Sequence, residues 1–347
     1  MLYKVIGIMS GTSLDGLDLA YCHFKYENNV WTYSIEKAKT IEYSLQIRNM
    51  LIQAENTSAL NFVEIDVLYG KFIGNKVKEF IDEYKLKVDF ISSHGHTIFH
   101  NPKNKITKQI GSIFEISAIT NITTIGDFRS MDVALNGQGA PLVPIGDRLL
   151  FSKYPSCLNL GGFSNISFEE NFKRIAYDIC PVNIVLNSLS QKLGMAYDKD
   201  GELAQRGNIN YSLLEELSKL EYYKIKDKKS LSREWVEKYI NPIMDLYDIT
   251  INDKLSTFTE HISIELSRNI KTDCLITGGG AFNKFLISKL KEKLPFNILI
   301  PDNTTINYKE ALIFAFLGVL RIRKQINVLS SVTGANKDSS SGVVVIV

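Results

Sequence analysis

Three glycine-rich loops constrain the fold of this chain most, because each directly follows a short apolar run of residues with high β propensity. The runs are 3–9, 157–160 and 273–277. The loops that follow them are Gly11-Thr12-Ser13-Leu14-Asp15-Gly16, Gly161-Gly162-Phe163-Ser164-Asn165 and Gly278-Gly279-Gly280-Ala281-Phe282-Asn283. A buried strand that ends at a glycine-rich loop is typical of α/β domains. We therefore expect an α/β protein whose strands end at these loops.

Loops of this composition suit a phosphate group. Glycine allows backbone N–H groups to approach an anion closely, and serine and threonine hydroxyls add further donors. The sequence has neither the GxxxxGK[ST] pattern of a P-loop nor the GxGxxG pattern of a dinucleotide site. One such loop alone is better explained by a tight strand-to-helix turn. Three of them, spread over both halves of the chain, favour a nucleotide held between two domains.

Length and composition set the outer limits. A chain of 347 residues suggests about two domains. Its 40 basic and 38 acidic residues give a net charge of +2, so no strong field attracts nucleic acid or an anionic membrane. The four cysteines lie far apart without a CxxC pair, which argues against structural zinc and suits a reducing compartment. With no signal peptide and no apolar run long enough for a membrane helix, we expect a cytoplasmic protein, and a homodimer is reasonable.

The pattern of apolar residues predicts further elements. Apolar side chains recur at three- and four-residue steps over 61–84, which indicates an amphipathic helix. A hairpin is expected around 27–29, a strand over 88–92 that ends at a polar loop, and a strand over 174–177 that ends at Asp178. Helices are expected at about 183–193, 211–217, 233–246, 252–270, 283–293 and 309–324. The last residues, 343–347, are expected to pair with a sheet or to fray.

Two groups of charged residues are candidates for chemistry. A carboxylate at the carboxyl edge of a strand, as predicted for Asp178, is well placed to act as a general base. The alternatives are a helix N-cap and a buried ion pair. Arg129 lies between Asp127 and Asp132 and offers a forked donor that suits a substrate carboxylate, although a surface salt bridge would look the same.

The histidines His94, His96 and His100 have the spacing HxHxxxH, which invites a metal-site interpretation. A strand-to-loop context makes the three rings hard to converge, and no nearby cysteine or carboxylate completes a ligand set. We therefore favour histidines that face a substrate, and loop packing for His100. No metal ligand is identified from the sequence.

Taken in order, these segments resemble the anhydro-N-acetylmuramic acid kinases, members of the actin–hexokinase–Hsp70 ATPase superfamily. The resemblance covers nearly the whole chain, and its first motif and the Gln138-Gly139-Ala140-Pro141-Leu142 loop are highly specific. The matching segments are 7–18, 93–97, 126–129, 136–142, 159–166, 197–204, 277–283 and 309–311.

The resemblance implies a fold, a reaction and two cofactors. It implies a two-domain actin/hexokinase-like (ribonuclease H-like) α/β ATPase fold with a central nucleotide cleft. The expected first domain is 1–126 plus about 306–347, and the expected second domain is 127–305. The implied reaction uses ATP, Mg²⁺ and water to open the 1,6-anhydro ring of a muramic acid sugar and to phosphorylate its O6. Such a reaction recycles cell-wall sugars in the cytoplasm.

By the same resemblance, individual residues receive roles. Asp178 would be the catalytic base, and His94, Arg129 and Glu310 would bind the sugar, with Arg129 at its lactyl carboxylate. ATP would be bound by Gly11, Thr12, Ser13, Leu14, Asp15, Gly16, Leu17, Asp18, Gly161, Gly162, Asn165, Gly278, Gly279, Gly280 and Asn283.

The chain departs from the family at one functional loop. The family usually has Asp-Thr-Gly-Pro-Gly-Asn where this chain has Asp178-Ile179-Cys180-Pro181-Val182-Asn183. Cys180 and Val182 carry β-carbons, which disfavour positive φ and restrict a close approach of the backbone to phosphate. Asn136 also replaces a common glycine, and asparagine is the most tolerant replacement there. Two alternatives therefore stay open: a kinase of another sugar, and a non-catalytic regulator that binds sugar or nucleotide.

Overall fold

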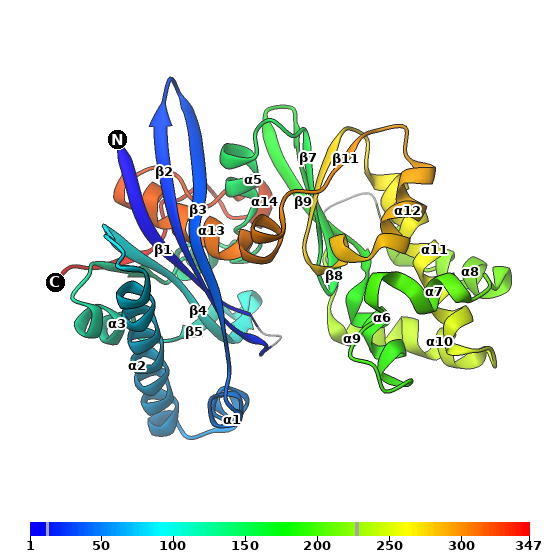
Figure 1. The fold of residues 1–347 in the computed structure, drawn as a ribbon, viewed down its shortest axis with the longest axis horizontal. Helices are drawn as coiled ribbons and strands as arrows, with labels where there is room; N and C mark the ends of the chain where they lie inside the picture. Colours follow the sequence, from blue (N-terminus) through cyan, green and yellow to red (C-terminus); the bar gives the residue numbers. More distant parts are fainter. Residues whose placement is uncertain (12–13, 226–228) are drawn as a thin grey trace. The chain divides into compact units, whose positions relative to one another are not determined.

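The chain divides into two compact units, each containing one β-sheet (Figure 1). The computed structural model describes residues 1–11, 14–225 and 229–347. The first unit comprises Met1–Leu150 and Tyr308–Val347, and the second comprises Phe151–Asn307. The expected α/β class is confirmed, since each unit combines its sheet with helices.

The sheet of the first unit is mixed and has β4 and β1 at its centre. Its strand order is β12-β6-β4-β1-β2-β3, with β5 paired to β4. The strands are β1 (Leu2–Ser10), β2 (Gly16–Glu27), β3 (Val30–Glu42), β4 (Phe90–Asn101), β5 (Ile106–Ile110), β6 (Thr124–Gly126) and β12 (Val343–Val345). β1 runs parallel to β4 and antiparallel to β2, and β4 runs parallel to β6. β1 and β4 therefore run in the same direction, and β1 ends directly before the first glycine loop.

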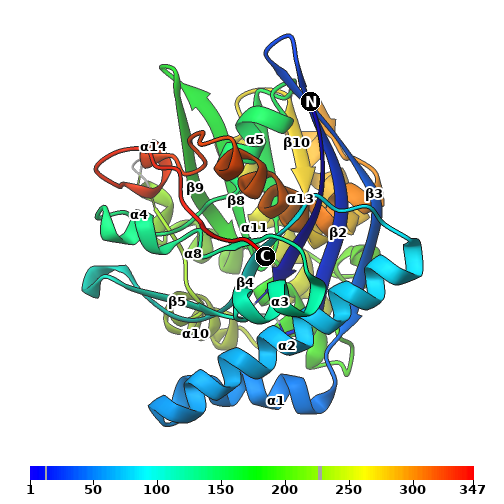
Figure 2. The same cartoon turned by 90° about the vertical axis from the view of Figure 1, so that its left-hand side faces the viewer.

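Helices cover both faces of this sheet, and the alternation of side chains along β1 shows why. Ile6 and Ile8 join the buried cluster that contains Ile73 and Val77 of α2 (Ala59–Tyr84). Gly7 points the other way, where a β-carbon would overlap the carbonyl oxygen of Ala311 in α13 (Asn303–Ile322). Figure 2 shows α2 and α13 with the strands of this unit. The remaining helices are α1 (Leu45–Gln53), α3 (Ile113–Thr120), α4 (Ser130–Ala134), α5 (Pro144–Leu150) and α14 (Ser330–Thr333).

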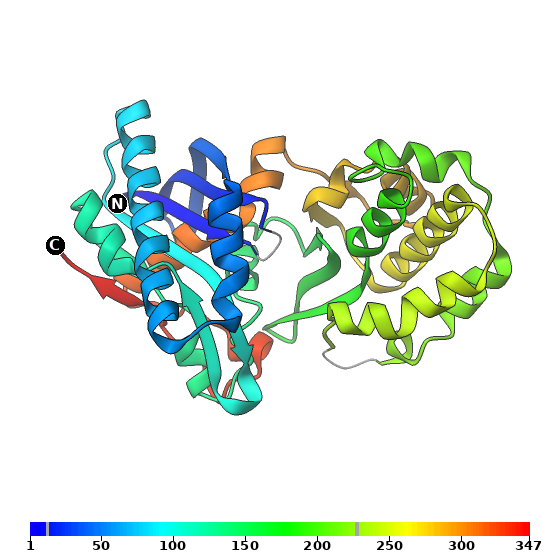
Figure 3. The same ribbon diagram turned by 90° about the horizontal axis from the view of Figure 1, so that it is seen from below.

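The second unit has a five-stranded sheet with the order β11-β10-β7-β8-β9. Its strands are β7 (Ser156–Leu160), β8 (Phe163–Glu170), β9 (Lys173–Pro181), β10 (Cys274–Thr277) and β11 (Ile298–Leu299). Its helices, green to gold in Figure 3, are α6 (Asn183–Gln191), α7 (Glu202–Arg206), α8 (Tyr211–Ser218), α9 (Arg233–Trp235), α10 (Asn241–Leu246), α11 (Ile251–Asn269) and α12 (Lys284–Lys293). The long helix α11 buries Leu255, Phe258, Ile262 and Leu266 in the core cluster of this unit.

Most of the expected elements are present. β1, β7 and β10 end at Ser10, Leu160 and Thr277, directly before the three glycine loops. The helix expected over 61–84 is α2, the hairpin around 27–29 joins β2 to β3, and the C-terminal run pairs with β6 as β12. Asn136 has φ 71°, so it adopts the left-handed conformation that asparagine tolerates better than most residues.

Two strands are longer than expected. β4 was expected to end near Ser92, but it continues to Asn101 because its second half pairs with β5. His94 and His96 therefore lie within a strand and not in a loop. Likewise β9 continues beyond Asp178 to Pro181, because its pairing with β8 extends to Phe163. A register shift between Ser164 and Asn165 lies opposite this part of β9.

The compact units divide after Leu150, whereas the expected boundary lay after residue 126. Side chains from the intervening segment explain this difference. Asp132 accepts a hydrogen bond from the hydroxyl of Thr333 at 2.7 Å, and Asp147 forms an ion pair of 2.8 Å with Lys309. Both partners belong to the C-terminal part of the first unit, so these contacts join residues 127–150 to that unit.

The close approach of α13 to β1 predicts a stability effect at Gly7. Gly7→Ala places a methyl group against the backbone of Ala311 and 2.8 Å from the β-carbon of Ala315. We expect the free energy of unfolding of the first unit to fall by about 3 kcal/mol, as for overpacking of a tight core. Chemical denaturation, monitored by Trp31 fluorescence in a Trp235→Phe background, measures this change in the free energy of unfolding.

Gly162→Ala is the matched control, because the nearest atom to its new β-carbon is 3.9 Å away. A Gly7→Ala variant as stable as this control would contradict the described packing of α13.

Candidate active site

Arg129 is the best-supported substrate-binding candidate in the first unit, because its guanidinium is held firmly on two sides. Its Nε and Nη2 lie 3.0 and 2.8 Å from Nε2 of His94, and Nη1 donates to the carbonyl oxygen of Gly139 at 2.6 Å. The guanidinium also lies 6.0 Å from the ring centroid of Phe314. Burial lowers the pKa of Arg129 to about 10, and the carboxylate of Glu310 opposes this shift. The group therefore stays positively charged at neutral pH.

His94 orients Arg129 with one ring nitrogen and contacts the backbone with the other. Its Nδ1 lies 2.8 Å from the carbonyl oxygen of Gly95, so Nδ1 carries the proton and Nε2 accepts from Arg129. Burial and the Arg129 charge hold the pKa of His94 well below its usual range. A neutral imidazole with both nitrogens engaged has no atom left for a ligand.

The two aspartates on either side of Arg129 have local structural roles. Asp132 is fully buried and accepts from the backbone N–H of Gly139 at 2.7 Å, so it holds the glycine-rich turn against α4. Asp127 is exposed and accepts from the N–H of Ser130 at 3.2 Å, at the start of the same helix. Within the described residues, neither side chain forms a salt bridge with Arg129. The guanidinium of Arg129 is therefore not used by these two aspartates.

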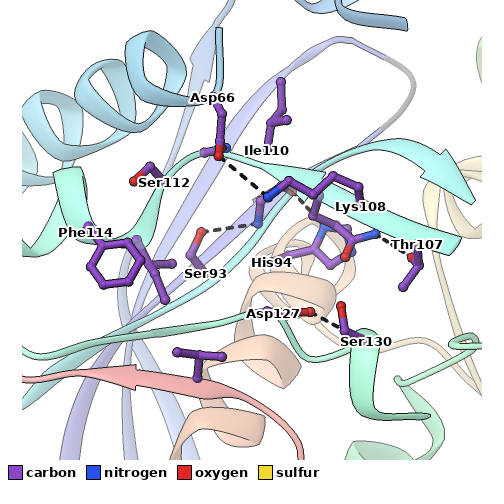
Figure 4. Close-up of a pocket in the computed structure, with 15 residues that line it drawn as sticks. Asp66, Ser93, His94, Thr107, Lys108, Ile110, Ser112, Phe114, Asp127 and Ser130 are labelled. Carbon is purple, nitrogen blue, oxygen red and sulfur yellow. Dashed lines mark hydrogen bonds and ion pairs between the residues drawn. The ribbon is translucent and has the colours of Figure 1, made fainter. Parts of the chain in front are cut away.

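A small polar cavity of about 200 Å³ lies beside β4, among α2, β5 and α3 (Figure 4). Asp66 forms an ion pair of 3.6 Å with Lys108 on its wall, and also accepts from the N–H of Gly111 at 2.7 Å. Ser93 accepts from the N–H of Gly95 at 3.2 Å. These contacts pair Asp66 with Lys108, and Asp127 also lines the cavity.

The first glycine loop is described only in part, since Thr12 and Ser13 lie outside the described residues. Leu14 has φ 58°, and its N–H donates to the carbonyl oxygen of Gly11 at 3.3 Å. Asp18 follows on β2 and accepts from the hydroxyl of Thr40 at 2.6 Å. Burial raises the pKa of Asp18. Glu310 lies on α13, and burial raises its pKa while the charge of Arg129 opposes the shift.

Asp178 in the second unit is half-buried in β9, and the segment after α8 fixes both its backbone and its carboxylate. Its N–H donates to the carbonyl oxygen of Lys229 at 3.0 Å, and its own carbonyl accepts from the Tyr222 hydroxyl at 2.8 Å. The N–H of Leu231 donates to Oδ2 at 2.8 Å. Burial raises the pKa of Asp178 to about 6, and the hydrogen bond from Leu231 opposes that shift.

Within the described residues, neither alternative for Asp178 is observed. The N-cap of α6 is Val182, so Asp178 does not cap this helix. Among the described residues, no cation lies within ion-pair distance of its carboxylate.

The altered loop after Asp178 places no residue at positive φ. Val182 has φ −129°, outside the left-handed region, and both Val182 and Cys180 are buried in the core of the second unit. Their side chains fill that core and do not need a glycine conformation. The N–H groups of Val182 and Ile184 donate to the carbonyl oxygen of Gly162 at 2.8 and 3.2 Å, so the second glycine loop and the start of α6 are one connected turn. Asn165 pairs with Asp178 across β8 and β9.

The third glycine loop borders a cavity of about 390 Å³ in the second unit. Gly278 has φ 82°, and a β-carbon there would overlap the side chain of Asn159, so glycine is required. Asn283 caps α12 by accepting from the N–H of Leu286 at 3.0 Å. The lining residues are Asn183, Leu186, Asn187, Tyr197, Asp198, Lys199, Asp200, Gly279, Phe282 and Asn283.

Comparison with known proteins places this chain in a family. The family model described as "Anhydro-N-acetylmuramic acid kinase" matches residues 3–346. This chain belongs to that family. Relatives of this name include proteins from Sulfurimonas denitrificans, 32% identical, and Mannheimia succiniciproducens, 35% identical, each matched over 98% of this chain and 98% of the relative. A relative of the same name from Hydrogenovibrio crunogenus is 30% identical over 98% of this chain and 97% of its own.

For this member of the anhydro-N-acetylmuramic acid kinase family, the structure brings several predicted site residues together. Arg129, His94 and Glu310 interact within the first unit, and Gly279 and Asn283 line one cavity of the second. Two exposed aromatic residues of that cavity, Tyr197 and Phe282, were not predicted as site residues from the sequence. The segments around them belong to the matching motifs, and that signal could have identified them.

The third histidine of the HxHxxxH pattern, His100, is exposed, and its Nδ1 lies 3.2 Å from the hydroxyl of Thr107. Partial burial and the charge of Arg129 lower its pKa. Within residues 1–11, 14–225 and 229–347, no three His, Cys, Asp or Glu side chains are grouped to hold a metal ion. In these same ranges, no helix has the length and apolar character needed to span a bilayer.

Proposed function

We propose that this chain is an ATP-dependent kinase that opens 1,6-anhydro-N-acetylmuramic acid with water and phosphorylates O6, giving N-acetylmuramic acid 6-phosphate. The observation that carries this proposal is the family match over residues 3–346. The environment of Asp178 supports it, because that carboxylate has the properties of a general base. The reaction would supply cell-wall sugar recycling in the cytoplasm.

In this proposal Asp178 takes a proton from the attacking water. A pKa of about 6 leaves the carboxylate mostly ionised at neutral pH while keeping it basic enough to accept a proton. Leu231 occupies Oδ2, and Oδ1 has no partner among the described residues, so it can face the water. The water oxygen bonds to the anomeric carbon, the bond from that carbon to O6 breaks, and O6 with its electron pair attacks the γ-phosphorus of ATP, releasing ADP. Such a sequence needs all reacting atoms in line.

Arg129 would bind the lactyl carboxylate of the sugar. Of the five N–H groups of a guanidinium, three point at His94 and Gly139, which leaves two for a ligand. Two parallel N–H groups match the two oxygens of a carboxylate. Since both ring nitrogens of His94 are occupied, we assign His94 a positioning role through Arg129 and not a direct contact with the sugar.

ATP would use the glycine loops, as the family resemblance implies. The backbone of 11–18 and of Gly161-Gly162 would contact phosphates, and the cavity beside Gly279 would take the nucleoside, with Tyr197 and Phe282 as apolar surfaces for the base. Mg²⁺ would neutralise phosphate charge. Asp18 fits such a cation, because burial raises the pKa of its carboxylate and a nearby positive charge would offset that cost.

The proposed reaction predicts the effect of removing the base. In a coupled assay of ADP release with 1,6-anhydro-N-acetylmuramic acid, Asp178→Asn should lower kcat by about a thousandfold, because the amide cannot accept a proton. Asp245→Asn, an exposed aspartate on α10 of the same unit, is the matched control and should retain activity. Wild-type turnover only with another sugar would favour the first alternative, and nucleotide binding without turnover would favour the second.

The raised pKa of Asp178 predicts a pH profile. The base works only when ionised, so kcat/KM should fall about tenfold per pH unit below an apparent pKa of about 6 and stay flat just above it. Steady-state rates between pH 5 and 8 measure this limb. An activity that is independent of pH down to 5 would rule out Asp178 as the base.

The assignment of Arg129 predicts a substrate-dependent loss. Arg129→Met should raise KM for 1,6-anhydro-N-acetylmuramic acid by about a hundredfold, since a charge-assisted contact is lost. The same variant should change KM much less for 1,6-anhydro-N-acetylglucosamine, which lacks the lactyl carboxylate. Equal losses with both sugars would show that Arg129 does not bind this carboxylate.

A further inference from the structure

Four side chains form a closed hydrogen-bond network where β1 and β4 approach the first glycine loop. The hydroxyl oxygen of Ser10 lies 2.7 Å from that of Tyr43, 2.7 Å from that of Tyr69 and 2.9 Å from Nδ1 of His96. The hydroxyls of Tyr43 and Tyr69 are 2.6 Å apart. Ser10 and His96 are register partners in the parallel pair of β1 and β4. All four residues belong to the first unit.

Counting protons in this network fixes the state of His96. Each hydroxyl has one proton to donate. The triangle of Ser10, Tyr43 and Tyr69 contains three contacts, which use all three hydroxyl protons. The fourth contact, between Ser10 and His96, therefore takes its proton from the imidazole. His96 must carry this proton on Nδ1, and in the neutral ring Nε2 is then a bare acceptor.

His96 is neutral and its Nε2 is unsatisfied by the described chain. The side chain is 4% exposed, and burial lowers its pKa to about 4, so it is uncharged at neutral pH. No described residue donates to Nε2. An imidazole nitrogen that carries no proton is a hydrogen-bond acceptor, so Nε2 can receive a donor from a ligand. This differs from His94, whose two nitrogens are both engaged.

The position and the chemistry of this acceptor narrow the choice of ligand. Ser10 is the last residue of β1, directly before the first glycine loop, and His96 lies beside it within β4, two residues after the His94 that contacts Arg129. Ionised phosphate oxygens only accept hydrogen bonds, so a neutral Nε2 lone pair cannot bind them. It selects a group that donates a proton, such as a hydroxyl.

We propose that His96 is a specificity-determining residue of the sugar site, whose Nε2 accepts a hydrogen bond from a hydroxyl group of the bound sugar. The Ser10–Tyr43–Tyr69 triangle holds the imidazole in the tautomer that this contact requires. The inference rests on the proposed function for the identity of the sugar. Ribose hydroxyls of the nucleotide have the same donor chemistry, and the test separates the two sources.

Two substitutions at His96 separate its two nitrogens. His96→Asn places an amide near Nδ1, so it can still donate to Ser10, but it has no atom at Nε2. We expect its thermal unfolding midpoint to stay close to the wild-type value and its KM for 1,6-anhydro-N-acetylmuramic acid to rise about tenfold, as for one lost hydrogen bond. Its KM for ATP should stay within about twofold. His96→Gln instead reaches toward Nε2 and should keep more of the sugar affinity.

Nitrogen-15 spectra of the imidazole rings test the tautomer independently of turnover. The wild-type protein should show His96 protonated on Nδ1. Tyr69→Phe leaves two hydroxyl protons for the two remaining contacts of Ser10, so His96 should shift toward protonation on Nε2. Tyr84→Phe, on the same helix but outside the network, is the matched control and should leave the pattern unchanged.

Several outcomes would overturn the proposal. Protonation of His96 on Nε2 in the wild type would contradict the proton count. If the substitution Asp178→Asn inactivates the enzyme but His96→Asn leaves the KM for the sugar unchanged, His96 does not contact the sugar. If His96→Asn raises only the KM for ATP, the hydroxyl group belongs to the nucleotide. Absence of wild-type turnover would refute the proposed function and, with it, the assignment of the donor to this sugar.

Discussion

The close packing of α13 on β1 is the contact on which the candidate site of the first unit depends. The absence of a side chain at Gly7 lets the helix backbone approach the central strand, and Ser92 of β4 donates to the carbonyl oxygen of Phe314 at 2.5 Å. Phe314 then lies under the site, with its ring centroid 4.5 Å from that of His94. A helix held further away would leave Arg129 and His94 without this floor. The same helix carries Glu310, so one packing distance positions several of the proposed sugar-binding groups.

Burial of polar side chains is the common theme of both units. It raises the pKa of Asp178 and lowers those of His94 and His96, in each case because a charged form loses hydration. The backbone or a neighbouring hydroxyl satisfies one atom of Asp178 and of His96, at Leu231 and at Ser10. One atom of each group is thereby left for a ligand. Loss of hydration shifts the pKa of each side chain, and its one hydrogen bond within the protein determines which atom remains for a ligand.

Much of the architecture could be predicted from local pattern. The strand-then-glycine pattern located the ends of β1, β7 and β10, and the spacing of apolar residues located α2 to within two residues. The chemical types of Asp178 and Arg129 suggested their roles. The strand ends expected near Ser92 and before Asp178 were wrong, because β4 is extended by pairing with β5 and β9 by pairing with β8, and cross-strand pairing leaves no signal in the local pattern. The roles of Tyr222 and Leu231 were also missed, since backbone and hydroxyl donors from a distant segment carry no motif.

The amino-acid sequence by itself determined the α/β class, the three glycine loops and the family, because these depend on residue type and short-range spacing. Only the tertiary structure decided which of two neighbouring histidines has a nitrogen to spare. His94 and His96 are two residues apart and chemically identical in the sequence, yet one is used by Arg129 and Gly95 while the other receives its tautomer from three hydroxyls. The physical reason is that proton positions follow from partners, and these partners come from β1, α2 and segments far apart in the chain.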